Sequence, residues 1–355
     1  MDAVSDVLRF VRLSGAVYLN GEFTAPWCLY GQTDTPLRKY FMPGLLPNSE
    51  RVVSYHLITE GRCWAWLPDQ PGAALQVDAG ELLVVPQGEA HVMASARDLP
   101  PVQGSELLAN PLRASPGDVL RVHYGGGGDA TRMLCGFLAC DESFNNPVLT
   151  ALPRMFKIDM RNDPHSAWLE SSLKFAAIEA AQWRAGSATV LARLSELLFV
   201  EAVRRCIDAL PPDRKGWLAA VGDRFVGRAL AVMHAQPAHC WTVDELARKV
   251  GLSRSALAQR FSELLGQPPM QYLASWRLMI AAQELVSGTK TLAAIAEQIG
   301  YESEAAFNRA FKREFGMPPA GWRKSRAKEG GAAASEKAGV IGNAAAPVPE
   351  AVART

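Results

Sequence analysis

Two short stretches in the C-terminal third carry hydrogen-bonding side chains at helical spacing, one at 254–259 and the other at 304–312. Gln and Asn pair well with adenine, Arg pairs with guanine through two hydrogen bonds, and small residues contact thymine methyl groups. The chemistry of both stretches is therefore that of base recognition. The candidate residues are Arg254, Ser255, Ala258, Gln259, Glu304, Ala305, Asn308, Arg309 and Lys312.

The first stretch belongs to a pattern at 242–266 that predicts two helices joined by a tight turn. Thr242 and Glu245 have the spacing of a capping box, so we expect a helix to begin after Thr242. Gly251 ends that helix because Gly adopts the left-handed conformation at low cost, and Ser253 is a good N-cap for the next helix. The residues predicted to face inward are Val243, Leu246, Ala247, Val250, Leu257, Phe261 and Leu264 or Leu265.

The same pattern recurs at 291–316, with Gly300 as the stop and Ser303 as the cap. Two helices joined by a Gly-containing turn form a helix-turn-helix unit, whose second helix is shaped to enter the major groove of DNA. One copy is a weak signal, whereas two copies joined by an amphipathic helix at 270–286 predict DNA binding. The inward residues of the second copy are Leu292, Ile295, Ala296, Ile299, Ala306, Phe307, Ala310, Phe311 and Phe315.

The segments GQPPMQYLASWRLMIAAQEL and GYESEAAFNRAFKREFGMPPAGWRK resemble the DNA-binding domain of the AraC/XylS family of bacterial transcription regulators. This resemblance implies an all-helical domain that places two recognition helices in successive major grooves. By position, it implies that the residues facing bases are Ser255, Ala258, Gln259, Glu304, Ala305, Asn308 and Arg309.

The charge distribution agrees in sign with this expectation. The chain of 355 residues has a formal net charge of +1, but residues 241–326 hold twelve Lys and Arg against eight Asp and Glu. A positive C-terminal region favours contact with phosphates. The N-terminus has early acidic residues and no long apolar core, and the six Cys lack the spacing of a disulfide scaffold. We therefore expect a cytoplasmic protein without a membrane span or structural disulfides.

The N-terminal half shows the alternation and turn residues of short strands, after a short amphipathic helix at 2–13. The predicted strands are 52–58, 63–67, 75–77, 81–85 and 133–138, which is typical of a β-sandwich or small barrel. The stretch from 95 to 131 is rich in Pro, Gly and Ser and is predicted to be a flexible insertion between two strands. Its run Gly125–Gly128 lacks the Lys-Ser/Thr of a phosphate-binding loop.

The stretch GELLVVPQGEAH at 80–91 has the spacing of the second cupin motif, and HLITE at 56–60 resembles the end of the first. The chain thus resembles a cupin barrel in front of an AraC-type domain, with Ser54 and Ser95 where two motif residues are expected. The resemblance implies that His56, Glu60 and His91 converge, where they would bind a divalent metal, with Cys135 as a further ligand or reactive thiol. An organic effector or ordinary core packing are the alternatives.

Residues from 164 onward predict two amphipathic helices, the second ending near Pro211 and Pro212. They either form a dimer interface or cover the barrel. The predicted architecture is multidomain α+β: a cupin-like sensor barrel at 1–155, a helical linker or dimerisation region at 156–222, an all-α domain with two helix-turn-helix units at 223–325, and a disordered tail at 326–355.

Two functions fit this arrangement. The first is a sequence-specific DNA-binding transcription regulator, in which a small molecule, metal or redox signal at the barrel changes DNA occupancy or recruitment of RNA polymerase. We expect such a regulator to be a homodimer and not an enzyme. The alternative is a metal-dependent cupin enzyme fused to a DNA-binding domain, against which the Ser54 substitution counts. The sequence does not separate an activator from a repressor.

Overall fold

A computed structural model describes residues 3–10, 14–31, 51–104, 120–140, 147–161 and 184–325 apart from 212, with scattered positions between 171 and 182. The contacts between residues divide the chain into two units, 1–277 and 278–355. The predicted tail at 326–355 and most of the first predicted linker helix lie outside the described residues.

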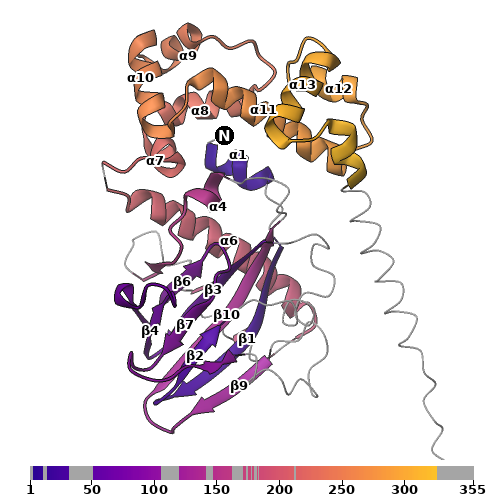
Figure 1. Ribbon diagram of the computed structural model, residues 1–355. Coiled ribbons are helices and arrows are strands. Elements are labelled where there is room, and N and C mark those ends of the chain that lie inside the picture. Colours follow the sequence, from indigo (N-terminus) through magenta and orange to yellow (C-terminus); the bar gives the residue numbers. More distant parts are fainter. Residues whose placement is uncertain are drawn as a thin grey trace, which may run out of the picture. The chain divides into compact units, whose positions relative to one another are not determined.

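Eleven strands of the first unit form two sheets within the described part of the chain (Figure 1). One sheet has the order β11-β6-β3-β10-β1-β9 and the other β5-β4-β7-β2-β8. We call the two sheets together the β-domain. The strands of the first sheet are β1 (Ser14–Thr24), β3 (Arg51–Glu60), β6 (Glu81–Val85), β9 (Leu120–Gly125), β10 (Ala130–Cys140) and β11 (Phe156–Asp159); those of the second are β2 (Cys28–Gly31), β4 (Arg62–Trp66), β5 (Leu75–Asp78), β7 (His91–Ala94) and β8 (Val102–Gln103).

The core of the β-domain lies between the two sheets. Phe23, Ile58 and Met133 from the first sheet form one buried cluster with Cys63 and Met93 from the second. This arrangement follows from the alternation of apolar residues along each strand, which turns every second side chain inward. All five strands expected from the sequence are present, and the predicted fold class is confirmed.

The stretch at 95–131 is not a single flexible insertion. It contains β8 and β9, and Gly125–Gly128 forms a tight turn into β10. The amides of Gly126 and Gly128 donate to the carbonyls of Thr24 and Ala25 at 2.9 and 2.8 Å. The prediction was wrong because the turn is fixed by a strand more than ninety positions away, and Gly composition alone carries no sign of that partner.

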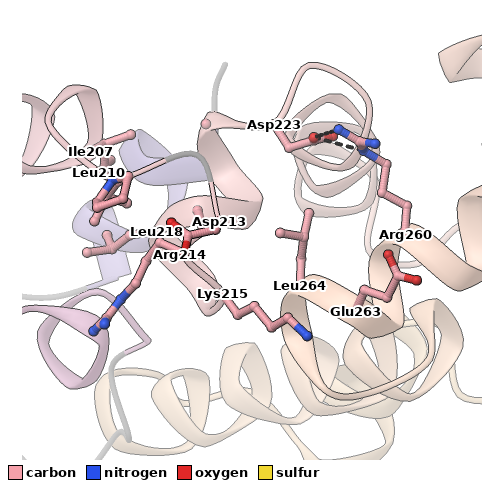
Figure 2. A pocket seen from close by; sticks show the side chains of 13 residues that line it. Ile207, Leu210, Asp213, Arg214, Lys215, Leu218, Asp223, Arg260, Glu263 and Leu264 are labelled. Atoms are coloured by element: carbon pink, nitrogen blue, oxygen red, sulfur yellow. Dashed lines mark hydrogen bonds and ion pairs between the residues drawn. The ribbon is translucent and has the colours of Figure 1, made fainter.

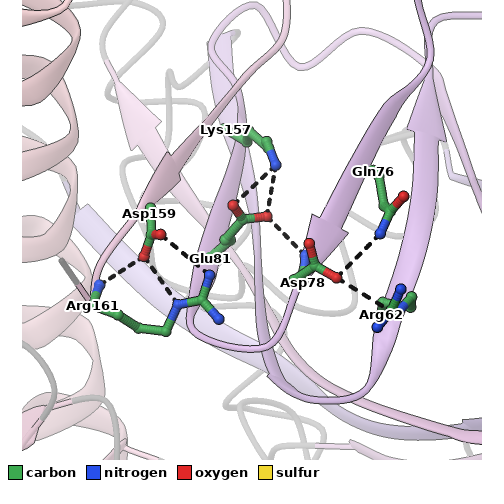
Figure 3. Close-up of polar contacts among 7 residues, drawn as sticks. All are labelled: Arg62, Gln76, Asp78, Glu81, Lys157, Asp159 and Arg161. Carbon is green, nitrogen blue, oxygen red and sulfur yellow. Dashed lines mark hydrogen bonds and ion pairs between the residues drawn. The ribbon is translucent and has the colours of Figure 1, made fainter.

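A polar network holds the edge where β6, β11 and the β5–β6 turn meet (Figure 3). The Lys157 ammonium donates to both oxygens of the buried Glu81 carboxylate at 2.9 Å, and the Asp78 amide donates to one of them at 2.7 Å. The Arg205 guanidinium on α6 (Ser187–Asp208) donates to the Asp159 carbonyl at 2.6 Å. The network therefore ties the β-domain to the linker helix that follows it.

The remaining elements are helical. They are α1 (Ala3–Phe10), the 3-10 turn η1 (Pro71–Ala73), α4 (Pro147–Ala151), α7 (Trp217–Gly222), α8 (Val226–Ala235), α9 (Val243–Val250), α10 (Arg254–Leu265), α11 (Pro269–Ser287), α12 (Leu292–Gln298) and α13 (Glu304–Phe315). Helix α6 packs along β1 and β10. It therefore covers one sheet of the β-domain, which is one of the two roles that the sequence allowed for this helix. None of the described helices combines the length and apolar character needed to cross a membrane.

Candidate nucleic-acid interface and β-domain cluster

The first helix-turn-helix unit is built as the residue types dictate. The Thr242 hydroxyl accepts from the Glu245 amide at 3.2 Å and so begins α9. Gly251 ends this helix in the left-handed region with φ 80°. The Ser253 hydroxyl accepts from the Ala256 amide at 3.2 Å and begins α10. These are the capping interactions expected of Thr and Ser at such positions.

Helix α10 has one buried face and one polar outer face. Leu257 and Phe261 are fully buried, whereas Arg254, Ser255 and Gln259 are exposed and Ala258 is half-buried. Its polar side chains contact neighbouring acids of the same unit. Arg254 lies 3.4 Å from the Asp244 carboxylate, and the Gln259 amide donates to Glu263 at 2.8 Å.

The second unit repeats the construction. Thr291 and Ser303 accept from the backbone amides of Ala294 and Ala306, each at 3.2 Å, and so cap α12 and α13. On α13, Phe307 and Phe311 are fully buried. The outward residues Glu304, Ala305, Arg309 and Lys312 are exposed and Asn308 is half-buried.

The structure therefore brings each predicted set of base-facing residues to one face of its own helix. Among the described residues, the Arg309 and Lys312 side chains form no ion pair, in contrast to Arg254. An exposed helix face with unneutralised cations is suited to a polyanion. Arg313 is also exposed on α13, and its position four residues after Arg309 was the signal by which the sequence could have included it.

Three of the four residues proposed to form a site in the β-domain lie together. His56 on β3 and Cys135 on β10 are direct cross-strand partners, and His91 begins β7 of the other sheet. His56 Nδ1 lies 3.0 Å from Cys135 Sγ, and the Nε2 atoms of His56 and His91 are 2.7 Å apart. All three side chains are buried.

The hydrogen bonds of this cluster assign its protons. His91 Nδ1 lies 2.9 Å from the Glu89 carbonyl, which only accepts, so His91 Nδ1 carries a proton. In neutral His91 the Nε2 atom is then an acceptor, and His56 Nε2 must donate to it. His56 Nδ1 consequently accepts from the Cys135 thiol. The result is a chain of neutral groups that ends at the Glu89 carbonyl, which we call the His–Cys chain.

Burial keeps the His–Cys chain neutral. Burial lowers the pKa of His56, and the neighbouring His91 lowers it further. Burial also lowers the pKa of His91, although the bond to the Glu89 carbonyl opposes this shift. The pKa of the Cys135 thiol is raised by burial and by the nearby Cys63. A buried neutral thiol is a poor nucleophile, so Cys135 is protonated and unreactive in this arrangement.

These residues do not fit a mononuclear metal as they stand. His56 uses both ring nitrogens within the His–Cys chain, so the three side chains do not converge on one point. Two imidazole nitrogens on one tetrahedral Zn²⁺ would lie about 3.3 Å apart, since Zn–N bonds are about 2.0–2.1 Å long. Within the described ranges, no group of three or more His, Cys, Asp or Glu side chains is arranged to hold a metal ion.

Glu60, the fourth residue proposed for this site, does not lie with His56, His91 and Cys135. The register of β3 against β10 shifts between Met133, opposite Ile58, and Arg132, opposite Glu60, so Thr59 is an extra residue in β3. This β-bulge reverses the side-chain direction after Ile58. Glu60 is therefore exposed and pairs with Arg132 at 2.5 Å. Neither the bulge nor the Glu89 carbonyl can be recognised from side-chain types, because both are backbone features.

Comparisons with known proteins agree with both halves of this description. A family model described as "Cupin" matches residues 2–208, and one described as "Helix-turn-helix domain" matches residues 246–325. A Streptomyces lividans protein named as an AraC-like transcription regulator is 31% identical over 279 residues, which cover 78% of this chain and 88% of the relative.

Two further similarities extend the comparison. The HTH-type transcriptional regulator AlkR of Acinetobacter baylyi is 27% identical over 325 residues, covering 91% of this chain and 99% of AlkR. The solved DNA-binding domain of AdpA in complex with a target DNA is 27% identical and covers 30% of this chain and 96% of that chain, with a TM-score of 0.29. The chain thus belongs to the AraC-like, DNA-binding transcription regulators that carry an N-terminal cupin domain.

Proposed function

We propose that the chain binds specific double-stranded DNA sequences through α10 and α13. The observation that carries this proposal is the repeated unit itself, in which a buried aromatic or aliphatic face fixes each helix and leaves a polar face exposed. The residues assigned to base or phosphate contact are Arg254, Ser255, Ala258, Gln259, Glu304, Ala305, Asn308, Arg309 and Lys312.

Selection from a random DNA pool tests this proposal. The purified full chain should enrich a defined sequence, and its affinity for that sequence should exceed its affinity for random DNA by at least about 10³-fold. The affinity should also fall steeply with salt, because phosphate contacts release counterions. Enrichment of no sequence, or affinity that is equal on all DNA, contradicts sequence-specific binding.

We further propose that the β-domain senses a signal at the His–Cys chain and so controls DNA occupancy. Support comes from the chemistry of the chain: three buried polar side chains satisfy one another and take part in no ion pair in the described part of the molecule. A small polar molecule that enters the β-domain would form hydrogen bonds with His56, His91 or Cys135 and so replace the bonds within the His–Cys chain. If this molecule bound the DNA-binding and the non-binding conformation of the protein with different affinity, that difference would couple the signal to DNA occupancy.

The first measurement for the sensor is metal and thiol content of the wild type and His91→Ala. We expect free thiols and no stoichiometric metal, which directs the search to organic ligands by thermal shift. Stoichiometric metal that is lost in His91→Ala would make the signal a metal ion and would require the His–Cys chain to rearrange. A thiol count that falls on mild oxidation, with altered DNA affinity, would make it a redox signal.

We also propose that the regulator acts as a homodimer that recruits RNA polymerase. Support for the dimer is an apolar stripe on α6, where Val190 is 41% exposed and Leu197 55% exposed seven positions later. An unpaired stripe at this spacing is suited to helix–helix contact. Sedimentation should show a dimer for the wild type and a monomer for Leu197→Glu. A monomeric wild type contradicts the proposal.

A further inference from the structure

Asp223, in the loop between α7 and α8, has both carboxylate oxygens engaged. Its Oδ1 accepts from the amides of Phe225 and Val226 at 3.0 and 2.9 Å, at the start of α8. Its Oδ2 accepts from Nε and Nη2 of Arg260 at 2.8 and 2.5 Å. The pair is visible at the upper right of Figure 2. One side chain therefore connects the start of α8 to the middle of the first recognition helix.

Asp223 and Arg260 are both ionised in this pair. Burial opposes ionisation of Asp223, but the bonds from Arg260 and from the two amides hold its pKa below the ordinary value. The Asp223 side chain is only 10% exposed. The Arg260 guanidinium also lies over the Phe225 ring, 5.7 Å from its centroid. Arg260, whose side chain is 49% exposed, thus contacts both Asp223 and Phe225, and its Nε and Nη2 donate to Asp223.

Arg260 follows Gln259 directly, yet it points to a different side of α10. From the sequence alone, a cation on a recognition helix would be interpreted as a contact to a phosphate or a base. In the structure the charged group nearest to Arg260 is the Asp223 carboxylate. Arg260 is therefore not part of the polar face that carries Ser255 and Gln259. The ion pair thus turns two donors of the half-exposed Arg260 toward Asp223 at the start of α8.

Apolar side chains do not fill all of the space on this side of α10. A cavity of about 440 Å³ lies between α10, α7 and the C-terminal end of α6, and Asp223 and Arg260 line it (Figure 2). Its walls include Ile207, Leu210 and Leu264. A second polar link across this side is a backbone bond from the Gly216 amide to the Leu264 carbonyl at 2.8 Å, at the end of the helix.

We propose that Asp223 and Arg260 are positioning residues that set the rotation of α10 about its axis, and thereby the direction in which Ser255 and Gln259 enter the major groove. The inference rests on the proposed recognition of DNA by α10. It makes the pair a determinant of sequence discrimination without any contact to a base. Without the pair, Leu257 and Phe261 still hold the helix on the core, and the helix shifts by a small rotation about its axis.

The test compares Asp223→Asn, Arg260→Gln and the double variant in the full chain. Asn keeps an oxygen for the α8 amides but no charge for Arg260, so Asp223→Asn isolates the pair from the cap. DNA enriched by the wild type and random DNA serve as the two probes. Each single variant should lose about tenfold affinity for the enriched DNA, the size of one lost base contact, and bind random DNA as the wild type does.

Two further readouts separate positioning from contact. The double variant should lose no more than either single variant, because both remove the same pair. The slope of log K against log salt should stay unchanged, whereas Lys312→Gln, which removes an exposed cation without an ion pair among the described residues, should reduce it by about one. Arg260→Lys, which keeps the charge, should recover part of the lost discrimination.

Several outcomes would overturn the inference. An equal loss on both DNA probes with a reduced salt slope would show that Arg260 contacts phosphate. Unchanged discrimination in both single variants would show that the pair does not orient α10. If the wild type enriches no sequence, the proposed function fails first, and the role of the pair fails with it; thermal unfolding of each variant confirms that the folded chain was compared.

Discussion

The two helix-turn-helix units share one construction but differ in how they treat their charges. Both begin their helices with Thr and Ser caps and bury an aromatic residue of the second helix. In the first unit Arg254 faces Asp244 and Gln259 bonds Glu263. In the second unit, Arg309 and Lys312 form no ion pair within the described residues. The difference indicates that the second unit has more charge available for DNA, and the first has its geometry fixed by internal contacts.

The largest effects should come from the buried faces, which the two units share. Phe307→Ala should cost about 3–5 kcal/mol of unfolding free energy and Leu257→Ala about 2–5 kcal/mol, because each leaves a cavity in a fully buried position. Urea unfolding measures both, with Ala305→Ser as an exposed control that should change stability by less than about 0.5 kcal/mol. An unchanged curve for either truncation would mean that its helix face is wrongly assigned.

Acid should destabilise the part of the chain up to residue 277, which contains the buried His234, more than residues 278–325. His234 on α8 packs against Trp276 and bonds the Tyr272 hydroxyl, and burial lowers its pKa to about 3, whereas residues 278–325 contain no His. The folded chain keeps His234 neutral while the unfolded chain binds a proton below about pH 6.5. Unfolding free energy should therefore fall as the pH drops from about 6.5 toward 3, by about 2 kcal/mol between pH 7 and pH 5 from this residue.

The comparison of wild type with His234→Gln isolates this contribution. The variant should start less stable at pH 7 and lose less between pH 7 and pH 5 than the wild type does. His56 and His91 have lowered pKa values as well, so a smaller residual loss should remain in the variant. Parallel pH curves for the two proteins would show that His234 is not held neutral by the fold.

Removal of one arginine from each unit tests the difference in available charge. Arg309→Ala should cost about 1–3 kcal/mol at the enriched DNA sequence if Arg309 reads guanine. Arg254→Ala should cost less than about 1 kcal/mol, because Arg254 must first leave Asp244. Competition binding on enriched and random DNA measures both. Equal losses of affinity on the two DNAs would show that Arg309 contacts phosphate only. A larger loss for Arg254→Ala than for Arg309→Ala would show that the first unit, and not the second, has more charge available for DNA.

Among the changes in stability, removal of the helix caps should give the smallest effects, and the two effects should be similar. Ser253→Ala and Ser303→Ala each remove a side-chain acceptor at the start of a recognition helix and should each cost about 1 kcal/mol of stability. Thermal unfolding measures the shift. Clearly unequal costs would show that the repeated construction is not energetically equivalent in the two units.

The sequence was sufficient where structure is decided locally. Caps, glycine stops and inward faces at 242–316 depend on residues within a few positions of one another, and the structure has them as predicted. It was insufficient where a distant backbone group decides. The Glu89 carbonyl that orients His91, the strand that fixes Gly125–Gly128, and the Asp223 carboxylate that holds Arg260 carry no local mark in the sequence.

The extra residue Thr59 in β3 has a consequence for how this β-domain could change over generations. If each residue of β3 had its own partner, Thr59 would lie opposite Arg132 and Glu60 opposite the buried Thr131, and the Glu60 carboxylate would turn to the same face as Ile58. One residue inserted into β10 between Arg132 and Met133 would give Thr59 a partner, and would therefore turn the Glu60 carboxylate to the interior with no side chain replaced. Within this fold, gain or loss of a metal centre is a matter of strand length as much as of residue identity.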